Sequence, residues 1–243
     1  MTSRILSQTY YGDKTTEIAE SRWKGLFIAG GVAAFSMLVL MIVQIIVFAV
    51  WPPPATVAGY FSLFQKNWLL GLLSLDLLYI VDNVLLILIY LAVYLVLRKA
   101  GESSMLIALI FGIAGIAAYF ASNTAFEMLS LSNQYAAATT EAQRATLLTM
   151  GQVMLETYKG TAFDIYYVLN TIVLFIFSPV MLRSRLFSNA TAYFGFLAGL
   201  LMVIPSSAGT LGLYFSLASL IPWAIWLVLV GQRLLQLGRQ LDN

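Results

Sequence analysis

Residues 25–51, GLFIAGGVAAFSMLVLMIVQIIVFAVW, form a continuous apolar segment that is long enough to cross a membrane. It contains no charged side chain, and Gln44 is its only residue with a side-chain amide. A helix of about 20 apolar residues crosses the hydrocarbon core of a bilayer, which is about 30 Å thick. Because Trp51 leads directly into Pro52 without a small-residue cleavage site, we predict a retained transmembrane helix rather than a signal peptide.

Further apolar stretches of similar length follow along the chain. They are residues 68–98, 104–126, 161–182, 190–211 and 212–235, the last two joined by a very short connection. We therefore predict an all-α membrane protein with six transmembrane helices built as helical hairpins. This single domain spans residues 25–238, between polar cytoplasmic tails at residues 1–24 and 239–243.

The composition agrees with this fold class and excludes several functions. Of the 243 residues, 60% are hydrophobic and only 10% are charged, whereas soluble domains carry about 25% charged residues. Because 13 basic residues nearly balance 11 acidic ones, no strongly basic surface is available for nucleic acid. Cys and His are absent, which excludes disulfides, thiolate and Ser-His nucleophiles and nearly every zinc site. We predict no cofactor and no metal centre.

The basic residues are distributed unevenly between the two sides of the predicted bundle. Ten of the 13 fall on one side: Arg4, Lys14, Arg22, Lys24, Arg98, Lys99, Arg183, Arg185, Arg233 and Arg239. The other side holds Lys66, Arg144 and Lys159. Since basic residues accumulate on the cytoplasmic side, we predict a bacterial inner-membrane protein with both termini in the cytoplasm. The connections at residues 52–67 and 127–160 then face outward.

Both outer connections carry helical patterns. In the first, Val57, Tyr60, Phe61 and Phe64 recur on one helix face after a run of prolines. In the second, Thr140 and Gln143 have capping-box spacing. They precede a single apolar stripe of Leu147, Met150, Met154 and Tyr158. We predict two amphipathic helices on the outer face, which either cover the bundle at the interface or form a lid over a cavity.

A short polar motif occurs in two of the predicted spans. Asp76, Tyr79 and Asp82 have the same spacing as Asp164, Tyr167 and Asn170, which gives Asp-x-x-Tyr-x-x-Asp/Asn twice. Each motif follows one span and one outer helix, so the chain is either a parallel duplication of a helical hairpin or a chance match.

An Asp at the centre of a membrane helix costs about 2.5 to 3.5 kcal/mol on insertion and rarely faces lipid. In a continuous helix Asn83 shares the face of Asp76, with Tyr79 between them. In the third span a stripe of Gly112, Gly115, Tyr119, Asn123 and Glu127 becomes polar towards the outer end. The predicted ligand-binding residues are therefore Asp76, Tyr79, Asn83, Asn123, Glu127, Asp164 and Tyr167.

Simpler structural roles stay open for each acid. Asp164 and Thr161 have the spacing of a capping box, and Glu127 can lie at the water boundary. Asp76 lies too deep to be a cap unless its helix breaks near Gly71 and Ser74. Asp82 points away from Asp76 and can join neighbouring helices through a hydrogen bond.

Three segments resemble a family of bacterial polytopic membrane proteins known as domain of unknown function four-three-eight-six. They are LLGLLSLDLLY at residues 69–79, GTLG at residues 209–212 and WLVLVGQRLL at residues 226–235. The resemblance covers most of the chain from Gly25 onward. It implies a six-helix plan and supplies no activity and no catalytic residues.

Function stays open at this level. We favour an accessory or structural membrane role, in which the acids connect helices. Binding or transport of a cation, a polar solute or a lipid headgroup is the main alternative, and a carboxylate-based enzyme is a lesser one. The bilayer is the one predicted partner, and the oligomeric state stays open.

Overall fold

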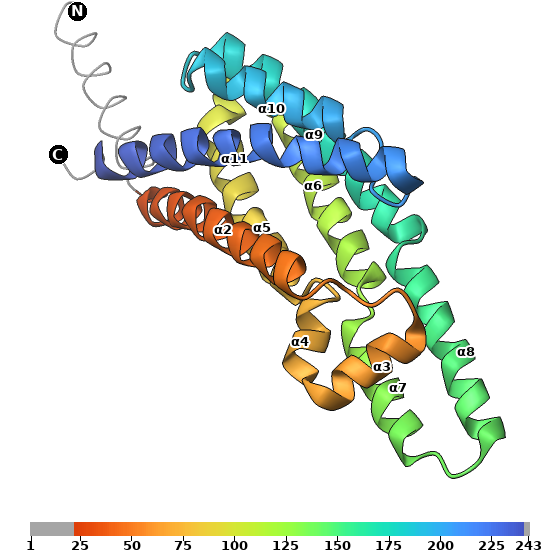
Figure 1. Ribbon diagram of the computed structural model, residues 1–243. Coiled ribbons are helices and arrows are strands. Elements are labelled where there is room, and N and C mark those ends of the chain that lie inside the picture. The colour runs from red at the N-terminus through yellow and green to blue at the C-terminus, as the bar shows by residue number, and fades with distance from the viewer. Residues whose placement is uncertain (1–21, 241–243) are drawn as a thin grey trace, which may run out of the picture.

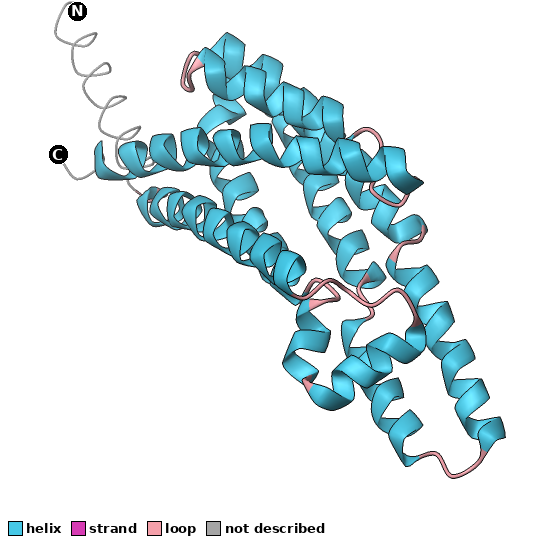
Figure 2. Cartoon of the chain, in the orientation of Figure 1, coloured by secondary structure: helices cyan, strands magenta, loops and turns pink. Residues whose placement is uncertain are grey.

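The computed structural model describes residues 22–240, and every regular element in this part of the chain is a helix (Figures 1 and 2). Five described segments are long and apolar enough to cross a membrane: Lys24–Val50, Leu77–Ala100, Glu102–Ala137, Glu141–Ser184 and Gly209–Gln240. The helical content and the length and composition of these segments confirm the prediction of an all-helical membrane protein. The predicted tails lie outside the described residues, except for residues 22–24, 239 and 240.

Six helices make up the main bundle. They are α2 (Lys24–Val50), α5 (Leu77–Leu97), α6 (Glu102–Ser122), α9 (Thr161–Ser184), α10 (Asn189–Met202) and α11 (Gly209–Gln240). Helix α2 packs against α5 and α11, α6 packs against α9, and α10 packs against both α9 and α11 (Figure 1). A Cβ atom on Gly31 would lie only 3.0 Å from the carbonyl oxygen of Gly231. Small residues therefore bring the backbones of α2 and α11 close together, as in other membrane helix pairs.

Four shorter helices form an outer layer at one end of the bundle (Figure 1). They are α3 (Val57–Lys66), α4 (Trp68–Leu73), α7 (Ala125–Ala137) and α8 (Glu141–Tyr158). This layer has its own hydrophobic core, which buries the predicted stripe of Val57, Tyr60, Phe61 and Phe64. The prediction of two amphipathic helices was incomplete, because α4 and α7 belong to the same layer.

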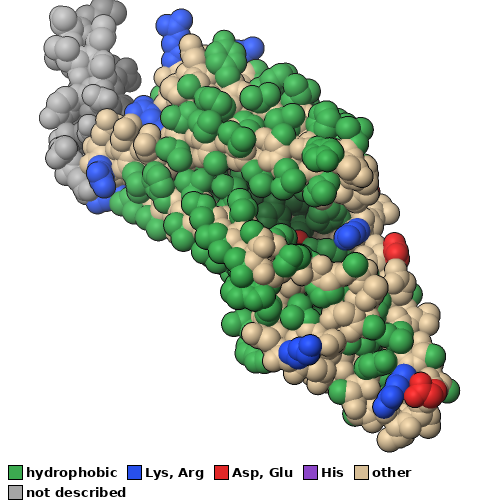
Figure 3. Space-filling view, in the orientation of Figure 1, with side chains coloured by type: hydrophobic (Ala, Val, Ile, Leu, Met, Phe, Trp, Pro, Cys, Tyr) green, Lys and Arg blue, Asp and Glu red, His purple; other side chains and the backbone are tan. Residues whose placement is uncertain are grey.

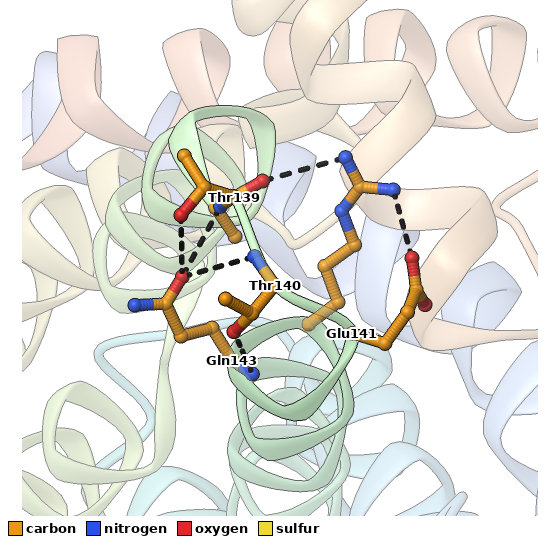
Figure 4. Close-up of polar contacts among 6 residues, drawn as sticks. Thr139, Thr140, Glu141 and Gln143 are labelled. Carbon is orange, nitrogen blue, oxygen red and sulfur yellow. Dashed lines mark hydrogen bonds and ion pairs between the residues drawn. The ribbon is translucent and has the colours of Figure 1, made fainter.

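The start of α8 is formed as predicted. The Thr140 side chain accepts a hydrogen bond from the backbone of Gln143, whose own side chain accepts one from the backbone of Thr140 (Figure 4). The predicted apolar stripe on α8 is only partly correct, since Met150 is 47% exposed. The buried position is Gly151, where an added Cβ would lie 2.4 Å from a methyl carbon of Val57. The other three stripe residues, Leu147, Met154 and Tyr158, pack against the core of the layer, and the close contact of Gly151 with α3 adds to this attachment of α8.

The predicted span at residues 68–98 is broken in the structure. Helix α4 ends at Leu73, α5 begins at Leu77, and Asp76 between them has a left-handed backbone with φ of 61°. An Asp tolerates this conformation better than a bulky residue does. Gln44 Nε2 donates to the carbonyl of Leu73 at 3.1 Å, and Asn123 Nδ2 donates to that of Leu75 at 2.9 Å. Asn123 thus satisfies a carbonyl that an apolar medium would otherwise leave unpaired, while Gln44 gives the Leu73 carbonyl a second donor beside the backbone N–H of Asp76.

Two other predicted boundaries also differ. The span at residues 104–126 divides at Asn123 and Thr124 into α6 and α7, and the span at residues 190–211 ends at Met202. Pro205, which has no backbone N–H, lies in the connection at residues 203–208. Helix α11 then begins at Gly209, with φ of 68°. The short connection therefore precedes its predicted position at Leu211 and Gly212.

The hydrogen bond from Asn123 generates a prediction for stability. In Asn123→Ala the Leu75 carbonyl loses its donor, so the free energy of unfolding should fall by about 1 to 3 kcal/mol. Denaturation in detergent, followed by circular dichroism, measures this change. Asn133→Ala removes the same side chain from an exposed position and should change stability by less than about 0.5 kcal/mol. Equal effects of the two substitutions would contradict the assigned role of Asn123.

Candidate functional site

Two cavities lie one after the other between α2 and α11. The outer cavity, of about 440 Å³, has polar groups from Asp76, Tyr158, Lys159, Ser206, Ser207 and Thr210. Its apolar wall includes Phe48 of α2 and Leu213 of α11. The inner cavity, of about 40 Å³, is bounded by Met37 of α2 and Trp223 of α11. Figure 3 shows a hollow on this face, lined by hydrophobic side chains, with acidic and basic atoms at its edge.

Asp76 lies in the outer cavity because the chain breaks between α4 and α5. The hydroxyl of Tyr158 donates a hydrogen bond to Asp76 Oδ2, and the charge of Lys159 acts on the same carboxylate. Asp76 is partly buried, and both the Tyr158 hydroxyl and the Lys159 charge stabilise its carboxylate form.

Asp164 lies beside the same cavity, in the first turn of α9. The predicted capping box with Thr161 is absent, because α9 begins after Gly160 and has no side-chain cap. Instead, Ser207 Oγ donates to Asp164 Oδ1 from the connection between α10 and α11. The tertiary fold thus links Asp164 to the wall that faces Asp76.

Tyr167 also reaches this wall. Its hydroxyl lies 2.8 Å from Ser216 Oγ and donates to Ser206 Oγ at 3.4 Å. Of the three residues that the sequence grouped together, Asp76 lines the outer cavity, while Asp164 and Tyr167 bind two serines of its wall, Ser207 and Ser206. These two serines and Lys159 were not predicted as site residues, because loop and helix-end positions show no periodicity that marks them, and Tyr158 was predicted only as part of an apolar stripe.

Tyr79 and Asn83 belong to the inner cavity. The prediction that Asn83 shares a helix face with Asp76 is wrong, because Asp76 lies in the break before α5. The ring of Tyr79 packs against those of Tyr119 and Tyr166, and Tyr166 donates to the Tyr79 hydroxyl at 3.4 Å. An aromatic layer therefore forms part of the inner site.

The other two predicted site residues, Asn123 and Glu127, line neither cavity and bind none of the residues that line the outer one. Asn123 acts on the backbone, since it donates to Leu75 and accepts from the amide of Ala125. Glu127 is exposed in the first turn of α7, where its charge is favourable to the helix dipole. The predicted stripe ends before Glu127 because α6 stops at Ser122.

The residues of the repeated motif are distributed over both cavities. Of its first residues, Asp76 lines the outer cavity and Asp164 binds Ser207 in the cavity wall. Its last residues, Asp82 and Asn170, both line the inner cavity. Asp82 was predicted to join helices through a hydrogen bond and not as a site residue, although its place in the motif was the signal that marked it.

Comparison of the chain with protein-family models, with curated proteins and with solved structures returns no match. The geometry of the two cavities is therefore the basis for any assignment of function.

The cavity geometry predicts which positions react with a thiol reagent. The chain has no Cys, so a single introduced Cys gives a clean signal. Thr210→Cys, which lines the outer cavity, should react rapidly with a small hydrophilic thiosulfonate in detergent. Ser178→Cys, buried in α9, should react only after unfolding. Mass spectrometry of timed samples measures both rates, and fast labelling of Ser178→Cys in folded protein would contradict the described packing.

Proposed function

We propose that the outer cavity binds the headgroup of a zwitterionic, amine-bearing membrane lipid. The observation that carries this proposal is that Asp76 and Lys159, of opposite charge, line one cavity together with several hydroxyl groups. A carboxylate suits an ammonium group, and a Lys suits a phosphate. The hydroxyls of Ser206, Ser207 and Thr210 supply further donors and acceptors for phosphate and ester oxygens.

The surroundings of the cavity favour a lipid over a soluble zwitterion. Phe48 and Leu213 are part of its wall. Large apolar side chains continue from it along the outer halves of α2 and α11 and stay exposed: Ile45, Ile46, Val50, Leu217 and Ile221. In a bilayer this surface contacts acyl chains, so a headgroup in the cavity can leave its own chains in the lipid phase.

An accessory role is the second candidate, and two hydrogen bonds favour it. Tyr158 binds Asp76, and Ser207 binds Asp164. These bonds connect α8 and the connection at residues 203–208 to the bundle, which is what acids with a purely structural task would do. In this role Lys159 only offsets the burial of Asp76, whereas the lipid proposal also gives a use to the hydroxyl groups that line the cavity with it.

The proposed membrane arrangement has six spans in three helical hairpins, with both termini in the cytoplasm of a bacterial inner membrane. Helix α10 has 14 residues and a length of about 21 Å, so residues 203–208 would complete its crossing. The lopsided distribution of basic residues supports the orientation. The same plan accords with the proposed relation to the family of unknown function named above.

Lipid binding should depend on both charged residues. A thermal-shift titration in detergent should show saturable stabilisation by phosphatidylethanolamine, and less by phosphatidylglycerol, which has no amine. Asp76→Asn and Lys159→Gln should each weaken this binding by about tenfold to a hundredfold, since each removes one charge-assisted contact. Glu127→Gln and Lys66→Gln remove the same charges outside the outer cavity and should leave the affinity unchanged.

The two candidate functions give different results in this titration. The lipid proposal fails if phosphatidylethanolamine stabilises the wild type and the Asp76 and Lys159 variants equally, or does not stabilise the wild type. If Asp76→Asn lowers the melting temperature while lipids have no effect on any variant, the accessory role explains the site. Size-exclusion profiles establish that each variant is folded before it is titrated.

The proposed orientation has its own test. Alkaline phosphatase fused at Ala145 should be active, because the outer layer faces the oxidising compartment, and the same enzyme fused after Arg98 should be inactive. A fluorescent-protein fusion at each site should show the reverse pattern. Activity after Arg98 and its absence at Ala145 would invert the topology.

A further inference from the structure

The inner cavity contains two buried side-chain oxygens without a hydrogen-bond partner. Asp82 is 4% exposed and Asn83 is 1% exposed, and both line the cavity. Asp82 Oδ1 and Asn83 Oδ1 make no hydrogen bond. The Asn83 amide is held by its nitrogen, which donates to the carbonyl of Tyr79 at 2.9 Å. Unpaired buried oxygens are rare in proteins because they lose their hydration without compensation.

No Lys or Arg lines the inner cavity to neutralise Asp82. A carboxylate in such a place has to take up a proton or bind a cation. The surrounding groups favour a cation, because several residues with side-chain oxygens line the same cavity. Besides the Asp82 carboxylate and the Asn83 amide oxygen, these include the hydroxyls of Tyr79 and Tyr166, which lie 3.4 Å apart. Oxygen ligands of this kind suit hard cations.

The size and charge of the cavity restrict which cation fits. A volume of about 40 Å³ holds a small ion with few water molecules. Asp82 supplies a single negative charge, and the described residues contain no group of three or more His, Cys, Asp or Glu for a divalent metal. A divalent ion would leave excess positive charge among apolar helices, whereas a monovalent ion is balanced.

We propose that Asp82 and Asn83 form an intramembrane binding site for a small monovalent cation of the sodium class, with the Tyr79 and Tyr166 hydroxyls as further ligands. The site is distinct from the proposed headgroup site, because no residue lines both cavities. Asn170, the matching last position of the motif on α9, lines the same cavity but is not a ligand, because its oxygen accepts from the Tyr90 hydroxyl and its nitrogen donates to the carbonyl of Tyr166. Cation binding at the site would join α5 and α9 through the cavity between them.

Equilibrium binding of ²²Na⁺ to the purified full-length chain in detergent, at constant ionic strength set with choline chloride, tests this proposal. The wild type should bind the ion saturably, and Asp82→Asn should lose binding. Tyr79→Phe keeps the ring packing and removes one ligand, so its affinity should fall by about threefold to tenfold. Glu127→Gln, an exposed acid outside the inner cavity, should bind as the wild type does.

A second measurement, of melting temperatures, tests the proposal even if a variant is less stable than the wild type. Sodium should raise the melting temperature of the wild type and of Glu127→Gln, relative to choline, and should not raise that of Asp82→Asn. The proposal is overturned if the wild type binds no ²²Na⁺, if Asp82→Asn binds it equally well, or if choline stabilises as strongly as sodium. In the first case Asp82 carries a proton, and the inner cavity is a neutral packing feature.

Discussion

The whole arrangement depends on how the backbone carbonyls at the break between α4 and α5 are satisfied. An apolar medium supplies no hydrogen-bond donors, so a helix can be interrupted there only where the protein provides them. Gln44 of α2 and Asn123, which follows α6, provide donors for Leu73 and Leu75. These bonds fix the positions of α2, α5 and α6 relative to one another at the level of the break. They also hold Asp76 in its left-handed conformation at the start of α5.

The two cavities follow from this break. Because α4 turns into the outer layer, Asp76 faces outward towards Tyr158 and Lys159, while α5 continues inward with Asp82 and Asn83. Glycines such as Gly31 and Gly231 allow close contact between the inner halves of α2 and α11. Towards the outer end the two helices leave apolar surface exposed and enclose the cavities between them.

The two acids on either side of the break experience different electrostatic conditions. Asp76 has a hydroxyl donor and a nearby Lys, which together offset part of the cost of its burial. Asp82 has neither, although it is only 4% exposed. The outer cavity is thus suited to a ligand that carries both charges, and the inner cavity to one that brings a positive charge of its own. Asp76 and Asp82, the first and last residues of one short motif, therefore lie in two different environments.

The helical membrane class, the stripe of α3 and the cap of α8 could be predicted from the sequence, because each depends on local composition or on residues only a few positions apart. Equal spacing also marked Asp76 and Asp164 as members of one motif, and a helix break near Gly71 and Ser74 was one of the alternatives. The tertiary structure was needed to choose the broken helix, to exclude Glu127 from the site and to add Lys159 and Ser207 to it. The bonds responsible join residues far apart in the chain: Gln44 with Leu73, Asn123 with Leu75, and Ser207 with Asp164. Local patterns carry no information about such partners, because packing of the whole bundle brings them together.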